Sequence, residues 1–226
     1  MKRRTRLKDR ILPAYSPAEE CMNMVTHIVG GALGIAALIL CTLRAAKNGT
    51  GFDILGSVIF GAAMILLYTV SSVYHGLHRG TGKKVLQVLD HCTIYVLIAG
   101  TYTPILISAV MPAAPAVAWG LLAAEWLLAA LAVTLTAIDL KRYRAFSMVC
   151  YIGLGWGILP FLGIIWHVMD AGGFFLLLSG GIAYTVGAVL YGIGSKKPWF
   201  HSVFHLFVLL GSILHALAVL LYALPA

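Results

Sequence analysis

Seven long apolar runs, separated by short polar or turn segments, restrict what this chain can fold into. They lie at residues 22–43, 53–77, 86–110, 115–138, 145–168, 173–193 and 199–223. Each run can cross the hydrocarbon core of a bilayer as a helix, which takes about 20 mostly apolar residues. Because 61% of the 226 residues are hydrophobic and only 11% are charged, a water-soluble domain could not cover its surface with polar groups. We predict an all-α membrane protein, a seven-transmembrane helix bundle.

The charged residues between the runs predict which way the bundle faces. With the amino terminus inside, the cytoplasmic segments hold fourteen Lys and Arg residues, and the outer segments hold only Arg44 and Lys47. Positive charge favours the cytoplasmic side of a membrane. We therefore expect a multi-pass protein of the cell membrane with a cytoplasmic N-terminus and an outside C-terminus. Residues 1–20 would form a basic cytoplasmic segment, and residues 21–226 a single transmembrane domain.

The same basic residues indicate which kinds of partner the protein binds. The formal net charge is +8, but the basic side chains lie at the ends of the apolar runs, where they contact anionic lipid head groups. No basic patch interleaved with aromatic residues accompanies them, so we expect membrane lipids as partners and no nucleic acid. The four cysteines, Cys21, Cys41, Cys92 and Cys150, show no CxxC spacing. We expect neither a disulfide framework nor a thiolate metal site.

Small residues and prolines inside the runs predict local packing. Small residues let transmembrane helices approach closely, and two such pairs are Gly30/Gly34 and Gly153/Gly157. Proline inside a helix removes a backbone donor and bends the helix. We expect kinks at Pro104 in the third run and at Pro160 in the fifth.

Ionisable residues inside the runs gather at one depth. His75 lies four residues before Arg79, Asp90 six after Lys84, and His201 and His205 four and eight after Lys197. At a rise of about 1.5 Å per residue, all of them would lie roughly 6–12 Å below the cytoplasmic interface. Ionisable groups within a membrane are costly and mark functional sites, so we expect these four to share one site.

The spacing within this set favours a metal ion. His201 and His205 are four residues apart, which puts both imidazoles on one helical face, and Ser71 stands in the same relation to His75. If the second, third and seventh helices adjoin, His75, His201 and His205 can hold one ion and leave a coordination place open, as catalytic zinc sites do. Imidazole ligands without thiolates favour Zn²⁺.

Other roles remain open for single members of the set. Histidines in transmembrane helices often bond to a neighbouring helix, and for any one of them alone packing is the simpler explanation. Asp90 could be a fourth ligand, a residue that orients a water molecule, or the general base, and Ser71 could donate to a developing oxyanion or pack between helices. His78 competes with His75 but lies at the water boundary.

The remaining polar residues receive simpler interpretations. His91 is expected to face a different neighbouring helix from the one that Asp90 faces. His167 and His215 lie nearer the outer side and are interpreted as structural. Glu125 has no basic partner at its depth, so it should be neutral or face a water-filled cavity. Glu20, Asn23 and His27 open the first helix, where capping of the helix terminus is the default interpretation.

Four segments together resemble a known family. They are Ser71-Ser72-Val73-Tyr74-His75, Leu89-Asp90-His91, Ile98 through Pro104 and His201-Ser202-Val203-Phe204-His205, preceded by ECMNMVTH at residues 20–27. Over residues 16–222 the chain resembles the hemolysin III family, which is related to the progestin and adiponectin receptors and, more distantly, to alkaline ceramidases.

This resemblance implies seven helices, an internal amino terminus and a zinc ion near the cytoplasmic side. The ligands it implies are His75, His201 and His205, with Asp90 reaching the metal through water and Ser71 close by. It also implies hydrolysis of lipid amides such as ceramides.

Three functions follow as hypotheses. The first is a zinc-dependent intramembrane hydrolase of lipid amides or esters. The second is a non-enzymatic sensor or regulator of the membrane in which zinc holds helices together. The third is a pore-forming hemolysin-like protein, which ranks last because the charged groups gather at one depth and do not line a path across the bilayer.

Overall fold

The chain forms a bundle of helices in a computed structural model that describes residues 4–194 and 197–226. The α-helices are α1 (Pro17–Asn48), α2 (Gly51–Gly76), α3 (Thr81–Pro104), α4 (Pro115–Ile138), α5 (Arg144–Gly155), α6 (Leu162–Val168), α7 (Asp170–Gly194) and α8 (Phe200–Ala218). Short 3-10 or π segments are η1 (Leu7–Asp9), η2 (Ile105–Val110), η3 (Leu159–Phe161) and η4 (Val219–Ala223). Across both described ranges, every regular element is helical. Lys2, Arg3 and Lys196, which the topology argument counted, lie outside the described residues.

These elements make seven membrane-length helices within the described chain, as predicted. The π segment η2 prolongs α3 into a span of Thr81–Val110, η4 prolongs α8 into Phe200–Ala223, and α5, η3 and α6 together make the fifth span, Arg144–Val168. All seven are apolar enough to cross a bilayer by length and composition. The seven-helix architecture of an integral membrane protein is therefore confirmed.

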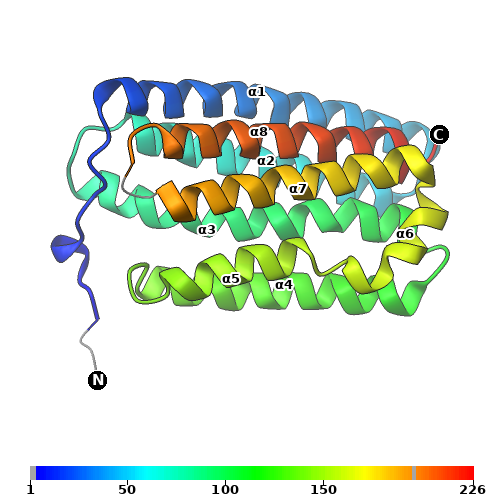
Figure 1. Cartoon of the computed structure of the whole chain (residues 1–226). Coiled ribbons are helices and arrows are strands. Elements are labelled where there is room, and N and C mark those ends of the chain that lie inside the picture. Colours follow the sequence, from blue (N-terminus) through cyan, green and yellow to red (C-terminus); the bar gives the residue numbers. More distant parts are fainter. Residues whose placement is uncertain (1–3, 195–196) are drawn as a thin grey trace.

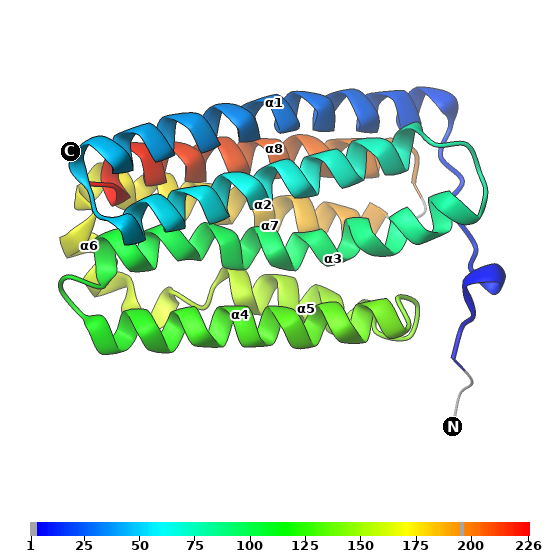
Figure 2. The same cartoon turned by 180° about the vertical axis from the view of Figure 1, so that it is seen from behind.

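The helices form a ring. α1 packs against α2 and α8, α2 against α3, α3 against α4, and α7 against α8, while α5 contacts α3, α4 and α7 and closes the circle. Figures 1 and 2 show the helices running along one another, with α4 and α5 together at one edge of the bundle and α1 at the opposite edge. The two termini lie at opposite ends, as an odd number of spans requires (Figure 1). The centre of this ring is where a site can form.

The start of the first helix differs from the expectation. Ser16 caps α1, and its capping box is completed by Glu19, whose carboxylate accepts from the backbone N–H of Ser16. The interpretation of Glu20, Asn23 and His27 as capping residues is therefore wrong. All three lie inside the helix, and their side chains are free for contacts with other helices.

The two internal prolines act differently from one another. After Pro104 the third span continues without interruption, as the π segment η2, in which Met111 N–H donates to the carbonyl of Leu106. At Pro160 the effect exceeds the predicted kink, because α5 ends at Gly155 and α6 begins only at Leu162. The fifth span is thus a broken helix.

Close helix packing centres on the first predicted glycine pair. A Cβ atom added to Gly30 would overlap the ring of Tyr68 on α2, and one added to Gly34 would come within 3.1 Å of the backbone N of Ile65. Tyr68 is fully buried and its hydroxyl donates to Ser212 on α8 at 2.7 Å, so the ring cannot move aside. The prediction was wrong for Gly153, which has nothing within 4 Å of such an atom.

The contrast between these glycines gives a test of the packing. Gly30→Ala should destabilise the protein by about 1–3 kcal/mol, the usual cost of overpacking a well-filled interior. Gly153→Ala is the matched control and should leave the stability unchanged within about 0.5 kcal/mol. Thermal unfolding of both variants in the same detergent measures the difference, and equal midpoints would show that α1 and α2 are not held this closely.

Candidate metal centre

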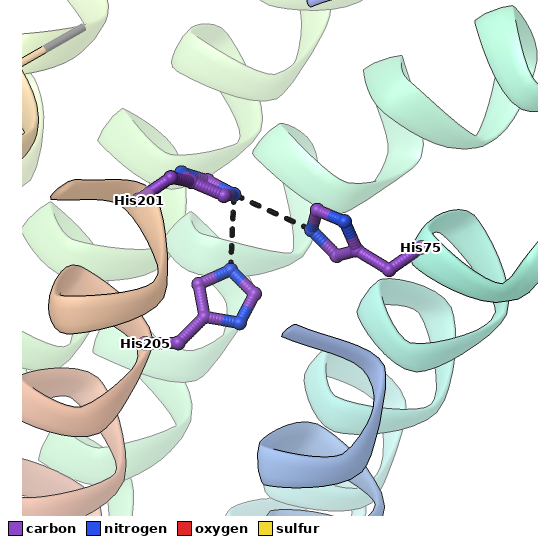
Figure 3. A group of neighbouring side chains, drawn as sticks. All are labelled: His75, His201 and His205. Carbon is purple, nitrogen blue, oxygen red and sulfur yellow. Dashed lines mark hydrogen bonds between the residues drawn. The ribbon is translucent and has the colours of Figure 1, made fainter. Parts of the chain in front are cut away.

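Three imidazoles converge at the end of the bundle that carries the amino terminus. His75 lies in the last turn of α2, and His201 and His205 lie in the first two turns of α8 (Figure 3). The Nε2 atom of His201 is 3.3 Å from Nε2 of His75 and 3.1 Å from Nε2 of His205. One ligand atom from each residue lies within 4.8 Å of the others, so the group could hold a metal ion.

Hydrogen bonding alone does not explain this arrangement. A neutral imidazole nitrogen either donates one hydrogen or offers one lone pair, so Nε2 of His201 cannot make two good hydrogen bonds to the other two rings. Nitrogen ligands at about 2.0–2.1 Å from a tetrahedral ion lie roughly 3.3–3.4 Å from one another. The observed separations of 3.3 and 3.1 Å match that spacing. The three nitrogens therefore fit a shared cation better than they fit each other.

A carboxylate fixes the orientation of His75. Glu20 of α1 contacts Nδ1 of His75 at 2.6 Å, and its other oxygen accepts from Nζ of Lys83 of α3 at 2.7 Å. The ammonium group favours the ionised carboxylate, which can only accept, so Nδ1 of His75 must donate. Nε2 of His75 then carries the lone pair that a metal requires. Asn23 Nδ2, 3.5 Å from the same Nδ1, is too distant to compete.

The start of α8 is held by the start of α1. Glu19 accepts from the backbone N–H of Trp199 at 2.7 Å, and Trp199 has the left-handed φ of 67°, a conformation that a bulky side chain rarely adopts. Two residues later His201 enters the site, with the ring of Tyr15 stacked on it at 4.9 Å between centroids. The contact between α1 and Trp199 therefore sets where the histidines of α8 point.

A cavity inside the ring of helices reaches two of the three imidazoles, those of His201 and His205. Its lining includes Ser71 and Asp90, the two residues proposed for catalysis, together with His201 and His205. Ser71 is buried, and within the described chain its hydroxyl has no hydrogen-bond partner. Asp90 is half-buried and does not belong to the group of potential ligand atoms. Both predicted catalytic residues thus border the same cavity as His201 and His205.

Four other histidines have different surroundings. His78 is exposed beyond the end of α2, and His167 is exposed on α6. His215 bonds to the carbonyl of Leu177 at 3.0 Å, near the far end of the cavity. His91 bonds to the carbonyl of Gln87 on its own helix, yet it also lines the cavity.

Comparison with known proteins supports one family assignment. The family model described as Haemolysin-III related matches residues 15–216. The chain belongs to the hemolysin III family. It is 39% identical to Hemolysin-3 of Bacillus cereus over 92% of this chain and 93% of that protein, and 37% identical to the Hemolysin-3 homolog of Bacillus subtilis (strain 168) over 92% and 96%. The human Monocyte to macrophage differentiation factor is 25% identical over 92% of this chain and 87% of its own length.

In this member of the hemolysin III family, α1 contributes residues to the site that were not predicted. His27 stacks on His205 with centroids 3.7 Å apart, and Glu20 holds His75. Both nitrogens of His27 are buried without a partner among the described residues. The sequence did indicate this contribution, because residues 20, 23 and 27 lie three and four positions apart and therefore share one helical face. Interpreting them as capping residues overlooked this spacing.

A double-mutant cycle tests the contact of Glu20 and Lys83. Lys83 is only 4% exposed and Glu20 21%, so Lys83→Met leaves the partly buried carboxylate with His75 as its remaining partner and should cost about 1–3 kcal/mol of stability. Glu20→Gln with Lys83→Met should cost less than the sum of the single changes. Unfolding midpoints of the four proteins in one detergent measure the coupling, and strict additivity would show that the two groups act independently.

Proposed function

We propose that this protein is a zinc-dependent hydrolase that cleaves lipid amides or esters inside the cell membrane, with the metal centre on the cytoplasmic side. The observation that carries the proposal is the convergence of three Nε2 atoms at ion-binding distances beside a cavity. The bacterial relatives and the seven apolar spans support the cell membrane as its location. The positive charge at the amino-terminal end supports the orientation.

The donor set favours zinc among the common metals. Three neutral imidazoles and no thiolate suit Zn²⁺, whereas Mg²⁺ and Ca²⁺ prefer oxygen ligands. His75, His201 and His205 would hold the ion and leave a fourth place for a reactant, the arrangement of catalytic zinc sites. A zinc ion there would polarise a carbonyl group and make water a stronger acid.

The shape and lining of the cavity favour a lipid substrate. Both His201 and His215 of α8 line it, and fourteen residues of helix separate them, about 21 Å at 1.5 Å per residue. One leaflet of hydrocarbon is about 15 Å thick, half of a ~30 Å core. The lining between these ends is mostly apolar and aromatic, as at Leu97, Ile105 and Phe174. An acyl chain could lie along the cavity with its polar linkage at the histidines.

Three residues around the metal centre would each have a distinct role in the reaction. Asp90 would accept the proton of the attacking water and later give a proton to the leaving group, the role of a general acid and base. The Ser71 hydroxyl, which has no hydrogen-bond partner in residues 4–194 and 197–226, would donate to the oxygen that becomes negative as the carbonyl is attacked. Glu20 would keep His75 in the tautomer that binds metal.

Metal analysis is the first test. Protein purified with zinc should hold about one equivalent, and His201→Ala should lose it because two imidazoles seldom retain zinc without a third ligand. Glu20→Gln should bind zinc about 10–100-fold more weakly in a competition assay, since the partner of a metal-bound histidine contributes that much. His167→Ala, which changes an exposed histidine, should match the wild type. Retention of zinc by His201→Ala would contradict the site.

Turnover is the second test. Reconstituted protein should release free fatty acid from a panel of ceramides and lipid esters, and Asp90→Asn should slow release by about 10²–10⁴-fold while zinc stays bound. The isosteric amide preserves size but cannot accept the proton. His167→Ala again serves as control. Release by the wild type no faster than by His201→Ala would refute the hydrolase.

A structural role for the metal is the second candidate, and one observation favours it. His75 belongs to α2 and His201 to α8, and α1 packs between these two helices in the ring. An ion shared by both would therefore link two helices that are not consecutive in the sequence and stabilise the fold, as ligands of the folded state do. In that case, removing zinc lowers the unfolding temperature of the protein. The protein also shows no Asp90-dependent turnover of any lipid.

A further inference from the structure

A second pocket lies outside the histidine site, where the amino-terminal segment crosses the end of the bundle. It encloses about 450 Å³ and is lined by Arg4, Arg6, Arg10 and the neighbouring Thr5 and Leu7, by Val85, Val88 and Leu89 of α3, and by Ala137 of α4. Small-molecule sites commonly measure about 300–1,000 Å³. The pocket therefore combines a group of guanidinium side chains with an apolar wall, and the proposed hydrolysis uses none of these residues.

Arg10 is the most informative of the three arginines. Its Nε and Nη1 atoms are buried, and no acceptor for them exists within residues 4–194 and 197–226. Both nitrogens carry N–H groups that point outward in the plane of the guanidinium, and each can donate a charge-assisted hydrogen bond to an oxygen of a carboxylate or phosphate. Burial lowers the pKa of Arg10, Asp139 opposes this effect, and the positive charge of Arg4 adds to it. Buried donors without an acceptor are costly, so these two nitrogens of Arg10 are suited to a bound anion.

The nearby acidic side chains are already engaged. Asp139 accepts from the backbone N–H groups of Thr5, Lys141 and Arg142, and Asp9 pairs with Nε of Arg6 at 2.8 Å. Arg4 uses its Nε to donate to the carbonyl of Ile138, which leaves the other end of its guanidinium for another acceptor. The protein itself therefore supplies the positive charge of the pocket and uses its acids elsewhere.

The apolar wall indicates which anion fits. Val85 and Leu89 of α3 are 40% and 45% exposed, and they lie in the first three turns of a membrane-spanning helix. They are placed to meet acyl chains at the depth where lipid head groups end. A small soluble anion would gain nothing from such a wall, whereas an acyl chain would bury apolar surface against it.

We propose that this pocket binds the head-group phosphate of an anionic phospholipid from the leaflet at the amino-terminal end of the bundle. Arg10 donates to the phosphate through its buried nitrogens, with Arg4 and Arg6 around it, and the acyl chains run along α3. The lipid thereby joins the amino-terminal segment to α3 and α4.

Lipid exchange in nanodiscs tests the proposal. Wild-type protein should retain phosphatidylglycerol in preference to phosphatidylcholine, as counted by native mass spectrometry. Arg10→Gln should weaken this binding by roughly tenfold or more, the loss expected from hydrogen bonds to a charged group. Arg142→Gln, which removes the same charge from an exposed residue outside the pocket, is the matched control and should bind like the wild type.

Further variants and probes separate the explanations. Arg10→Lys keeps the positive charge but not the planar guanidinium, so it should also bind phosphatidylglycerol more weakly. This variant replaces Arg10→Gln as the test if Arg10→Gln does not fold. Equal losses in Arg10→Gln and Arg142→Gln would overturn the proposal in favour of diffuse attraction. Inorganic phosphate that displaces phosphatidylglycerol completely at equal concentration would show a free-anion site instead. Equal retention of phosphatidylcholine would also refute the preference for an anionic lipid.

Discussion

The carboxylate of Glu20 lies between the imidazole of His75 and the ammonium group of Lys83, and through these contacts it joins α1, α2 and α3 at the level of the candidate metal centre. In water such a pair would be worth little, but a site mostly removed from solvent makes each member depend on the others. The pairing does more than hold helices together. It decides which nitrogen of His75 carries a hydrogen, and hence which nitrogen faces His201 and His205.

Much of the fold could be predicted from the sequence because a bilayer imposes simple rules. A span needs length and apolar composition, both of which can be read residue by residue, and the seven predicted runs all correspond to membrane-length helices. The convergence of His75 with His201 and His205 was also predictable, because depth below the last basic residue and a spacing of four determine height and face. The span rule needs no knowledge of neighbouring helices, whereas the convergence followed only on the condition that the second and seventh helices adjoin.

The features that could not be predicted depend on which helices lie next to one another or on the exact position of a single residue. Whether Glu19 or Glu20 completes the capping box is a difference of one position, yet it moves the other carboxylate onto the face that meets His75. Gly153 satisfies the same small-residue pattern as Gly30, but a Cβ atom added to it would meet nothing within 4 Å among the described residues. Pro160 indicates a bend, and the sequence does not show that the helix stops altogether from Gly155 to Leu162.

The site contains more polar atoms than its hydrogen bonds can satisfy. Within the described chain, both nitrogens of His27, Nδ1 of His205, Oδ1 of Asn23 and the hydroxyls of Ser71 and Ser202 are buried without partners. Such groups cost free energy, and the cost is not relieved by lipid. A bundle built only for stability would fill these positions with apolar side chains. Their concentration around three converging imidazoles therefore marks this part of the interior as a polar site that packing alone does not explain.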